Sequence, residues 1–287
     1  MGSRNSGLSV SDRAFSGSIP DVYDHYLVPL IFERYAQDLA HRTAVIQPKN
    51  VLEVAAGSGV VTRAVAPILG SDAHYVVTDL NSPMLNRARM RQLEDSRIDW
   101  RPVDALDLPF SDESFDLVLC QFGVMFFPDR VRAYQEAHRV LRPGGSFLYN
   151  MWDRIEANEF ADVVTNSLAE IFPSDPPQFL ARTPHGHYDK TVYQRELTDA
   201  GFGEVAVDKV TATSRAEDPS EPAIAYCQGT PLRNEIEERY GPGLEESTRI
   251  VTEAVRTRFG EGPVDGKIQG FVVHALRGSV DPGLNRL

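Results

Sequence analysis

The stretch from Val51 to Thr62 contains the residue types best suited to hold a ligand. It reads Val-Leu-Glu-Val-Ala-Ala-Gly-Ser-Gly-Val-Val-Thr, which predicts a short buried strand, a turn of small residues and the start of a helix. Glycine lets backbone amides approach a ligand closely, and the first turn of a helix offers unpaired N–H groups to a polar or anionic group. The stretch therefore predicts a ligand-binding turn. The alternative is an ordinary strand-to-helix turn, where small residues are also common.

Two aspartates follow predicted strands further along the chain. Asp79 closes the apolar run that starts at His74, twenty-six residues beyond Glu53, and Asp104 follows a predicted strand at 98–103. In a doubly wound sheet the carboxyl ends of the parallel strands form the rim where ligands bind, and an acid there can hold the two hydroxyls of a ribose. Both aspartates are therefore candidate ligand-binding residues. The alternative for Asp79 is a cap of the helix that follows it.

Strands must alternate with helices to bring these residues to one rim. Short apolar runs at 51–54, 74–79, 98–103, 114–122 and 146–152 are separated by helical segments, and a turn at 139–145 leads into the last run. This alternation predicts a parallel sheet with right-handed crossovers.

The last third of the chain has a different pattern. Predicted strands at 204–213 and 267–276 are separated by three helical segments, and 173–187 is rich in proline and turn-forming residues. The predicted fold is α/β: a Rossmann-like, seven-stranded, mostly parallel sheet with one antiparallel edge strand, helices on both faces, and a helical insertion or lid over the carboxyl-terminal rim.

Composition narrows the function classes. The chain has 287 residues, 42% of them hydrophobic, and a net charge of −12. That charge repels nucleic acid and anionic membranes, so we expect a small-molecule partner and no nucleic acid. Two cysteines, Cys120 and Cys227, form neither a disulfide framework nor a metal cluster. Without a signal peptide or a run of eighteen apolar residues, the chain is expected to be cytoplasmic with no membrane span.

The motifs resemble, in order, those of class I S-adenosylmethionine-dependent methyltransferases, of the small-molecule type similar to the ubiquinone/menaquinone biosynthesis methyltransferases. The similarity runs from about Asn50 to Asp153. It consists of Leu52 to Gly59 as the glycine motif, Thr78-Asp79, Asp104-Ala105 before Leu108-Pro109-Phe110, Phe115 to Val118, and Leu141-Arg142-Pro143-Gly144-Gly145.

The resemblance implies S-adenosylmethionine as cofactor and S-adenosylhomocysteine as product. It implies that Asp79 binds the ribose hydroxyls, that Met84 or Leu80 packs on the adenine, that Asp104 accepts from the adenine amino group, and that the Gln121 carbonyl faces the methionine amine. The full set of implied cofactor-binding residues is Glu53, Ala55, Gly57, Gly59, Asp79, Leu80, Met84, Asp104, Ala105 and Gln121. The sequence departs from the family at Ala55, where glycine is usual.

The resemblance also suggests a division of the chain. We expect a disordered arm at 1–19, an N-terminal helical lid at 20–45, and a methyltransferase domain at 46–287 with a helical insertion at about 214–262. Within the lid, apolar residues recur at four-residue steps from Leu27 to Leu39, and Pro29 allows a new helix to begin near it. A monomer and a homodimer are both compatible with this division.

Methyl transfer from a sulfonium is an in-line displacement, so no nucleophilic side chain is required. A hydroxyl acceptor would benefit from a general base. The candidates are His185, His187, His25, Tyr23, Tyr26 and Asp153. The alternatives are that the histidines are solvated loop residues and that the tyrosines pack on the sheet. His185 and His187 with Asp189 form too weak a ligand pattern for a metal site, so none is predicted.

Two other functions stay open at this point. A nicotinamide-dependent oxidoreductase would need Gly-x-Gly-x-x-Gly, but Thr62 stands at the third glycine and Asp104 has no role in that scheme. A cofactor-binding but catalytically silent partner or regulatory protein is the second alternative, because every residue with an expected role serves the cofactor.

Overall fold

The computed structural model describes residues 19–278. The predicted disordered arm lies outside the described residues except for Ile19, which is buried and opens helix α1 (Ile19–Val22).

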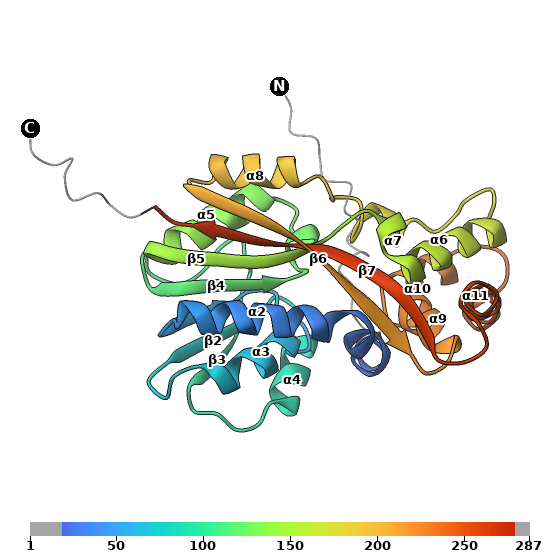
Figure 1. Ribbon diagram of the computed structural model, residues 1–287, viewed down its shortest axis with the longest axis horizontal. Helices are drawn as coiled ribbons and strands as arrows, with labels where there is room; N and C mark the ends of the chain where they lie inside the picture. Colours follow the sequence, from blue (N-terminus) through green and yellow to red (C-terminus); the bar gives the residue numbers. More distant parts are fainter. Residues whose placement is uncertain (1–18, 279–287) are drawn as a thin grey trace, which may run out of the picture. The chain divides into compact units, whose positions relative to one another are not determined.

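A seven-stranded sheet is built within the described residues, in the order β3-β2-β1-β4-β5-β7-β6 (Figure 1). Its strands are β1 Asn50–Glu53, β2 His74–Asp79, β3 Ile98–Pro102, β4 Phe115–Gln121, β5 Leu141–Trp152, β6 Glu204–Ala216 and β7 Val264–Leu276. The first five strands pair in parallel. The strand order reverses between β1 and β4, which is the place where open α/β sheets bind ligands.

The antiparallel pairing lies at the β7 side of the sheet. The Gly144 amide donates to the Arg277 carbonyl at 2.8 Å, and the Asp153 amide donates to the Gln269 carbonyl at 3.1 Å. Later residues of β5 thus meet earlier residues of β7, so the two strands run in opposite directions. The predicted fold class, a mostly parallel Rossmann-like sheet with antiparallel pairing at one edge, is confirmed.

Two compact units make up the chain. The sheet unit comprises Leu39–Asn150, Asp189–Asp208 and the described residues from 272 to 278. The helical unit comprises the described residues up to Asp38, Met151–Tyr188 and Lys209–Phe271. Strands β5, β6 and β7 contribute residues to both units.

Helices cover both faces of the sheet within the sheet unit. These helices are α3 (Val60–Val65), η3 (Ala66–Ile68), α4 (Ser82–Arg91), η4 (Val124–Phe126), α5 (Arg130–Val140) and α8 (Lys190–Asp199). On one face Glu53 bonds to Thr62 of α3. On the other, the Tyr149 ring lies 5.7 Å from Tyr134 of α5 and 6.3 Å from Tyr193 of α8. Neighbouring residues of a strand point to opposite faces, so each face acquires its own apolar layer.

The start of β5 differs from the expected turn at 139–145. Helix α5 continues to Val140, and β5 begins directly at Leu141. The pairing with β4 then jumps from Phe115 opposite Leu141 to Leu117 opposite Ser146. Gly144, with φ of +80°, lies in this irregularity, so the glycine pair makes a bulge inside the strand rather than a turn before it.

The helical unit begins with an unusual helical stretch. Helix α1 continues into the π-helix η2 (Tyr23–Phe32) and then into α2 (Glu33–Ile46), whose last residues belong to the sheet unit. Pro29 lies inside η2, so the predicted start of a new helix there is wrong. Proline has no N–H to donate, and a wider helical turn lets the chain pass it without a break.

Short helices fill the remainder of this unit. They are η5 (Ile155–Ala157), α6 (Glu159–Ile171), α7 (Phe179–Arg182), α9 (Ser220–Gln228), α10 (Leu232–Glu237) and α11 (Leu244–Phe259). The Phe160 ring of α6 is fully buried and meets Phe259 of α11 edge-on, with ring centroids 4.9 Å apart. The predicted helices at the end of the chain are thus present and share a core.

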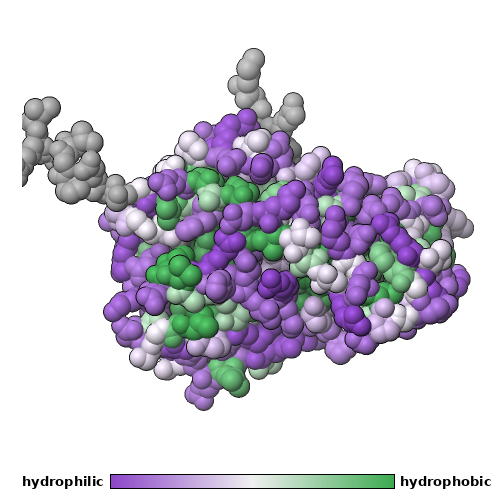
Figure 2. All heavy atoms as spheres, in the orientation of Figure 1, coloured by the Kyte–Doolittle hydropathy of each residue, from purple (hydrophilic) through white to green (hydrophobic). Residues whose placement is uncertain are grey.

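Polar residues prevail on the face of the molecule seen in the orientation of Figure 1. Figure 2 shows a face dominated by hydrophilic residues, with hydrophobic residues in separate groups. None of the helices in residues 19–278 combines the length and the apolar character needed to cross a membrane.

Candidate functional site

The turn between β1 and α3 adopts a left-handed backbone at alternate residues. The φ angles are +52° at Ala55, +57° at Gly57 and +78° at Gly59. A Cβ atom on Gly59 would lie 2.8 Å from the Ala88 Cβ on α4, which is too close for any side chain. Glycine at position 59 therefore serves both the backbone conformation and the packing of the turn against α4.

Ala55 carries a side chain in a conformation that normally favours glycine. Its methyl group meets the turn after β4, because a Cβ on Gly123 would lie 2.6 Å from the Ala55 Cβ and 2.8 Å from the Cys120 Sγ. The departure from the family at position 55 is thus matched by a residue without a side chain at position 123. The sequence analysis missed Gly123, and only its place directly after a strand could have indicated it.

Asp79 joins the end of β2 to this turn. Its Oδ2 accepts from the Gly57 amide at 2.7 Å, and its Oδ1 accepts from the Asn81 amide at 2.7 Å. The cap of α4 is Asn81, whose side chain accepts from the Met84 amide, so Asp79 is not needed as a cap. Burial raises the pKa of Asp79, and the two amide bonds oppose that shift. An ionised carboxylate has about four lone-pair directions, so this one can accept further hydrogen bonds from a ligand.

Met84 and Leu80 differ in their surroundings. Met84 is buried, and its Cε lies 3.9 Å from a Cβ built on Gly57. Leu80 is 62% exposed. The structure thus brings Met84 beside the glycine turn and leaves the Leu80 side chain exposed.

Asp104 lies in an irregular segment that follows β3. Its Oδ1 accepts from the Leu106 amide at 2.9 Å, which closes a small turn around Ala105. The Val103 amide donates to the Asp79 carbonyl at 3.2 Å and links this segment to the end of β2. Asp79 thus ends β2, and Asp104 follows the neighbouring strand β3 at the same rim.

Gln121 ends β4 beside a strained residue. Phe122 has φ of +50°, a conformation that a bulky residue adopts only when its surroundings enforce it. Asn150 of β5 lies opposite Gln121 and is fully buried. Within the described residues, neither the Asn150 amide nitrogen nor its oxygen has a hydrogen-bond partner. A polar group without a partner lies next to the expected methionine site.

Glu53 lies below the turn, inside the sheet unit. The carboxyl group accepts hydrogen bonds from the Tyr75 hydroxyl and, at 2.7 Å, from the Thr62 hydroxyl. Burial raises the pKa of Glu53 to about 7, although both hydroxyls favour the ionised form. The sequence indicated Glu53 but neither of its partners, because their side chains meet only in the folded chain.

Comparison with known proteins identifies this arrangement. Residues 52–149 match the model of a family described as "Methyltransferase domain". The ubiquinone/menaquinone biosynthesis C-methyltransferase of Laribacter hongkongensis is 31% identical over 182 residues, which cover 59% of this chain and 74% of that protein. The chain belongs to the class I S-adenosylmethionine-dependent methyltransferases.

Solved structures show the same fold. A candidate methyltransferase from Bacillus halodurans C-125 superposes with a TM-score of 0.55 at 21% identity, covering 85% of this chain and 99% of that one. Phosphoethanolamine N-methyltransferase 2 of Haemonchus contortus, solved with S-adenosylmethionine, gives 0.60 at 16% identity, covering 95% of this chain and 61% of that one. The protein is a methyltransferase that uses S-adenosylmethionine to methylate a small molecule. Nothing in these comparisons favours the oxidoreductase or the silent protein.

The residues at the rim fit this cofactor. The glycine turn leaves open space at Gly57, where a Cβ would meet only the Met84 methyl group within 4 Å. The Asp79 carboxylate lies at that turn, and Asp104 follows the neighbouring strand. Acids and small residues in this order suit a ribose, an adenine and a methionine chain better than a pyrophosphate, for which two carboxylates would be repulsive.

The structure brings two of the candidate acceptor residues together in the helical unit. His185 Nδ1 lies 2.8 Å from the Asp153 carbonyl oxygen, and its ring lies 5.9 Å from the Trp152 ring. The Asp153 carboxylate accepts from Gln269 Nε2 at 2.5 Å and from the Arg154 amide at 2.7 Å. Burial lowers the pKa of His185 to about 4. His185 is therefore a buried neutral imidazole, not the solvated loop residue that was the alternative.

The other acceptor candidates have different surroundings. Tyr23 stacks on Phe32 with ring centroids 5.2 Å apart, and His25 meets Tyr26 edge-on at 4.5 Å. Of these residues, His25 is exposed. His187 is partly exposed, and no group of three or more metal-ligating side chains is assembled anywhere in residues 19–278.

Replacing Ala55 tests the match between positions 55 and 123. Ala55→Gly should stabilise the protein by about 1 kcal/mol, because glycine adopts φ of +52° without steric cost. Gly123→Ala should destabilise it by about 1–3 kcal/mol through overpacking. Urea unfolding of the wild type, both single variants and the double variant measures these values. Additive effects in the double variant would contradict the match, because contacting residues should show coupling.

Glu53 should make stability depend on pH. Its pKa is raised from 4.5 to about 7, so the folded protein keeps a proton that the unfolded chain releases, and stability should fall as pH rises through that window. The free energy of unfolding should fall by at most about 3 kcal/mol over this pH range. Glu53→Gln keeps an acceptor for Tyr75 and Thr62 and should remove this component. Urea unfolding at pH 5 and pH 8 measures this change in the free energy of unfolding. An equal pH dependence in the wild type and in Glu53→Gln would disprove the assignment of the raised pKa to Glu53.

Proposed function

We propose that the methyl acceptor is a hydroxylated aromatic small molecule, and that His185 of the helical unit accepts the hydrogen bond of its hydroxyl group. One observation carries this proposal. His185 Nδ1 is engaged by the Asp153 carbonyl, whereas its Nε2 makes no hydrogen bond within the described residues.

The Asp153 carbonyl fixes the tautomer of His185. A carbonyl oxygen only accepts, so Nδ1 must carry the proton and Nε2 must present its lone pair. With a pKa of about 4, the ring stays in this form at neutral pH. Nε2 is thus a permanent acceptor that suits a ligand hydroxyl.

The strength of this base decides its role. A phenol has a pKa of about 10, so full proton transfer to an imidazole of pKa about 4 would cost about 8 kcal/mol. His185 therefore orients the hydroxyl and accepts its hydrogen bond in the ground state. It can take the proton only as methyl transfer makes the hydroxyl more acidic.

Aromatic side chains around His185 support an aromatic acceptor. Trp152 lies against its ring, and Tyr35 and Phe32 lie 5.3 Å and 6.1 Å from Trp152. Such a cluster suits a flat, apolar ring. The named relatives are C-methyltransferases of ubiquinone and menaquinone biosynthesis, and this also favours a ring with hydroxyl groups as the acceptor.

The sheet unit would hold the cofactor. We assign the ribose hydroxyls to Asp79, and the adenine to Met84 and Asp104. The methionine portion would lie at the Ala55–Gly59 turn and the Gln121 carbonyl. Glu53, at the end of β1, would support the turn from inside the sheet unit. The cofactor supplies a methyl group on a positively charged sulfur. The methyl passes to the acceptor, which loses one proton, and the protein aligns the two and excludes water.

The cellular setting belongs to the same proposal. Cys120 and Cys227 are both buried and are not joined to each other. Free, inert thiols are typical of the reducing cytoplasm, where we place the protein.

Turnover with defined acceptors tests the proposed function. Purified protein with S-adenosylmethionine and an alkylated 1,4-naphthohydroquinone, a simple phenol or an aliphatic alcohol should release S-adenosylhomocysteine with the aromatic compounds only. Mass spectrometry should show the acceptor gaining one CH₂. Turnover with the aliphatic alcohol alone, or none with either aromatic compound, would count against the aromatic assignment.

His185→Ala should raise the acceptor KM by about 10-fold or more, because a hydrogen bond is worth about 1–2 kcal/mol in such a site, and it should leave the KM of S-adenosylmethionine unchanged. His185→Gln should restore part of the effect through its amide oxygen. His187→Ala is the matched control. Because the pKa of His185 is about 4, wild-type activity should show no His185 ionisation between pH 5.5 and 7.5. A His185-dependent loss in that range would refute the neutral acceptor role.

Asp79→Asn should weaken S-adenosylmethionine binding by about 10- to 100-fold, since hydrogen bonds to a charged group are worth about 1.5–3 kcal/mol. Asp72→Asn is the control, because Asp72 precedes the opposite end of β2 and pairs with Lys49 at the surface. Isothermal titration calorimetry gives both affinities. Equal affinities of the two variants would exclude the ribose role of Asp79.

A further inference from the structure

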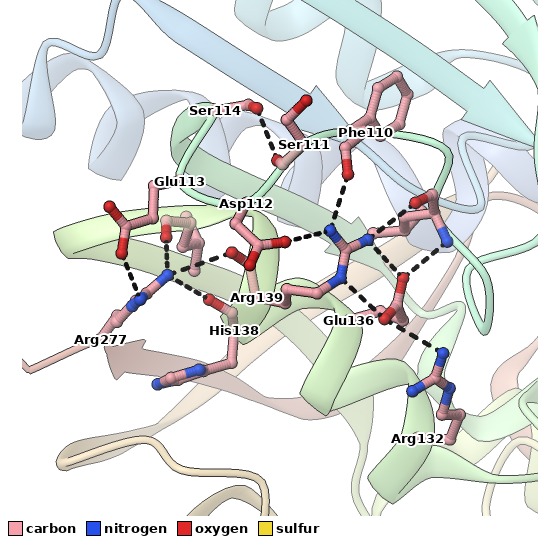
Figure 3. Close-up of polar contacts among 12 residues, drawn as sticks. Phe110, Ser111, Asp112, Glu113, Ser114, Arg132, Glu136, His138, Arg139 and Arg277 are labelled. Carbon is pink, nitrogen blue, oxygen red and sulfur yellow. Dashed lines mark hydrogen bonds and ion pairs between the residues drawn. The ribbon is translucent and has the colours of Figure 1, made fainter.

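One face of helix α5 holds the segment that follows β3. Arg132, Glu136 and Arg139 are spaced at i, i+4 and i+7, so their side chains leave the helix on the same side. Figure 3 shows Arg139 beside Phe110 and Asp112, with Glu136 next to Arg139 and Arg132 approaching Glu136. We refer to Arg132, Glu136 and Arg139 as the α5 clamp.

The α5 clamp binds backbone groups at alternate residues of the segment. Arg132 Nε donates to the Leu106 carbonyl at 3.0 Å, and Arg139 donates to the carbonyls of Leu108 at 2.8 Å and Phe110 at 2.7 Å. Glu136 Oε2 accepts from the Leu108 amide at 2.8 Å. Every second residue is thus fixed by a charged side chain, although the segment has no helix or strand of its own.

The members of the clamp also fix one another. Arg139 Nε and Nη2 donate to the two Glu136 oxygens at 3.0 Å and 2.8 Å, which is a bidentate pair. Arg132 approaches the same carboxylate at 3.2 Å. The hydrogen bond from Arg139, aided by the Leu108 amide, holds the pKa of Glu136 below its usual value. Bidentate geometry restricts both side chains, so the segment is held against a rigid support.

Asp104 and Ala105 stand at the start of this held segment. Asp104 accepts from the amide of Leu106, whose carbonyl is bound by Arg132. The position of the Asp104 carboxylate therefore depends on the α5 clamp, although no member of the clamp bonds to it among the described contacts.

We propose that the α5 clamp sets the cofactor's base specificity, with Glu136 and Arg139 as positioning residues that hold Asp104 and Ala105 in place for the adenine amino group. The inference rests on the proposed role of Asp104. A carboxylate selects an amino group over a carbonyl oxygen only while it is held at hydrogen-bond distance, so loosening the segment reduces the selectivity.

Two ligands that differ at position 6 of the base, and in whether the adjacent N1 carries a hydrogen, test this inference. S-adenosylhomocysteine carries the adenine amino group, and S-inosylhomocysteine carries a carbonyl oxygen in its place. The ratio of their dissociation constants, measured by calorimetry on the intact protein, reports base selectivity separately from overall affinity. We expect the wild type to favour S-adenosylhomocysteine by about 10- to 100-fold, because the Asp104 carboxylate accepts a hydrogen bond from the amino group but repels a carbonyl oxygen.

Arg139→Met should lower this ratio by about 10-fold. Arg139→Lys should restore little of it, since an ammonium group cannot serve Leu108, Phe110 and Glu136 together. Arg142→Met is the matched control, because Arg142 binds the Glu113 carbonyl and Asp116 but no group of the 104–110 segment. The ratio of the two dissociation constants for Arg142→Met should equal that of the wild type.

The outcomes separate this inference from the proposed function. If Arg139→Met weakens both ligands equally and leaves the ratio unchanged, the clamp only stabilises the fold and the inference is wrong. If Asp104→Asn leaves the ratio unchanged, the adenine role of Asp104 fails first. Circular dichroism confirms folding of each variant. Glu136→Gln, which keeps the size of the side chain, replaces Arg139→Met if that variant does not fold, and the same fall in the ratio is expected.

Discussion

The close approach of three backbone segments around the β1–α3 turn is the constraint on which the sheet unit depends. The Gly57 amide reaches the Asp79 carboxylate at 2.7 Å, Gly59 lies against Ala88 of α4, and Ala55 lies against Gly123 beyond β4. Each contact fixes the end of a different element relative to the same turn. Because interiors are close-packed, a side chain added at any of these places must move one of those ends. The geometry of the cofactor site is thus set by backbone contacts rather than by flexible side chains.

Burial favours the neutral form of two titratable groups, one in each unit. Glu53 below the turn has a pKa of about 7, and His185 in the helical unit has a pKa of about 4. In both, loss of solvent favours the neutral form, and the hydrogen bonds decide which atom faces outward. Glu53 therefore supports the turn from inside, whereas His185 presents a lone pair. The same physical effect thus produces a structural group in one unit and, in the function that we propose, an acceptor for a ligand hydroxyl in the other.

Helix α5 performs two tasks on two faces. Its apolar residues, among them Tyr134 and Ala137, are buried and complete the layer against Phe147 and Tyr149 of β5. Its charged residues hold the backbone of the segment after β3, which has no regular structure to satisfy its own amides and carbonyls. An irregular segment can be precise when charged side chains from a helix take over the hydrogen bonds that a sheet would otherwise supply.

The sequence by itself determined the alternation of strands and helices, the turn of small residues at Gly57 and Gly59, and the two acids after strands. These features are local, since apolar periodicity and the conformational freedom of glycine act within a few residues. Only the tertiary structure decided that Ala55 requires Gly123 and that Pro29 lies within a π-helix. It also decided that Gly144 and Gly145 form a bulge inside β5, and that Arg139 holds a segment about thirty residues earlier in the chain. The state of His185 was likewise decided by a carbonyl 32 residues away and by loss of solvent. Such features depend on which distant groups meet and on how much water they lose, and no local pattern of residues encodes either quantity.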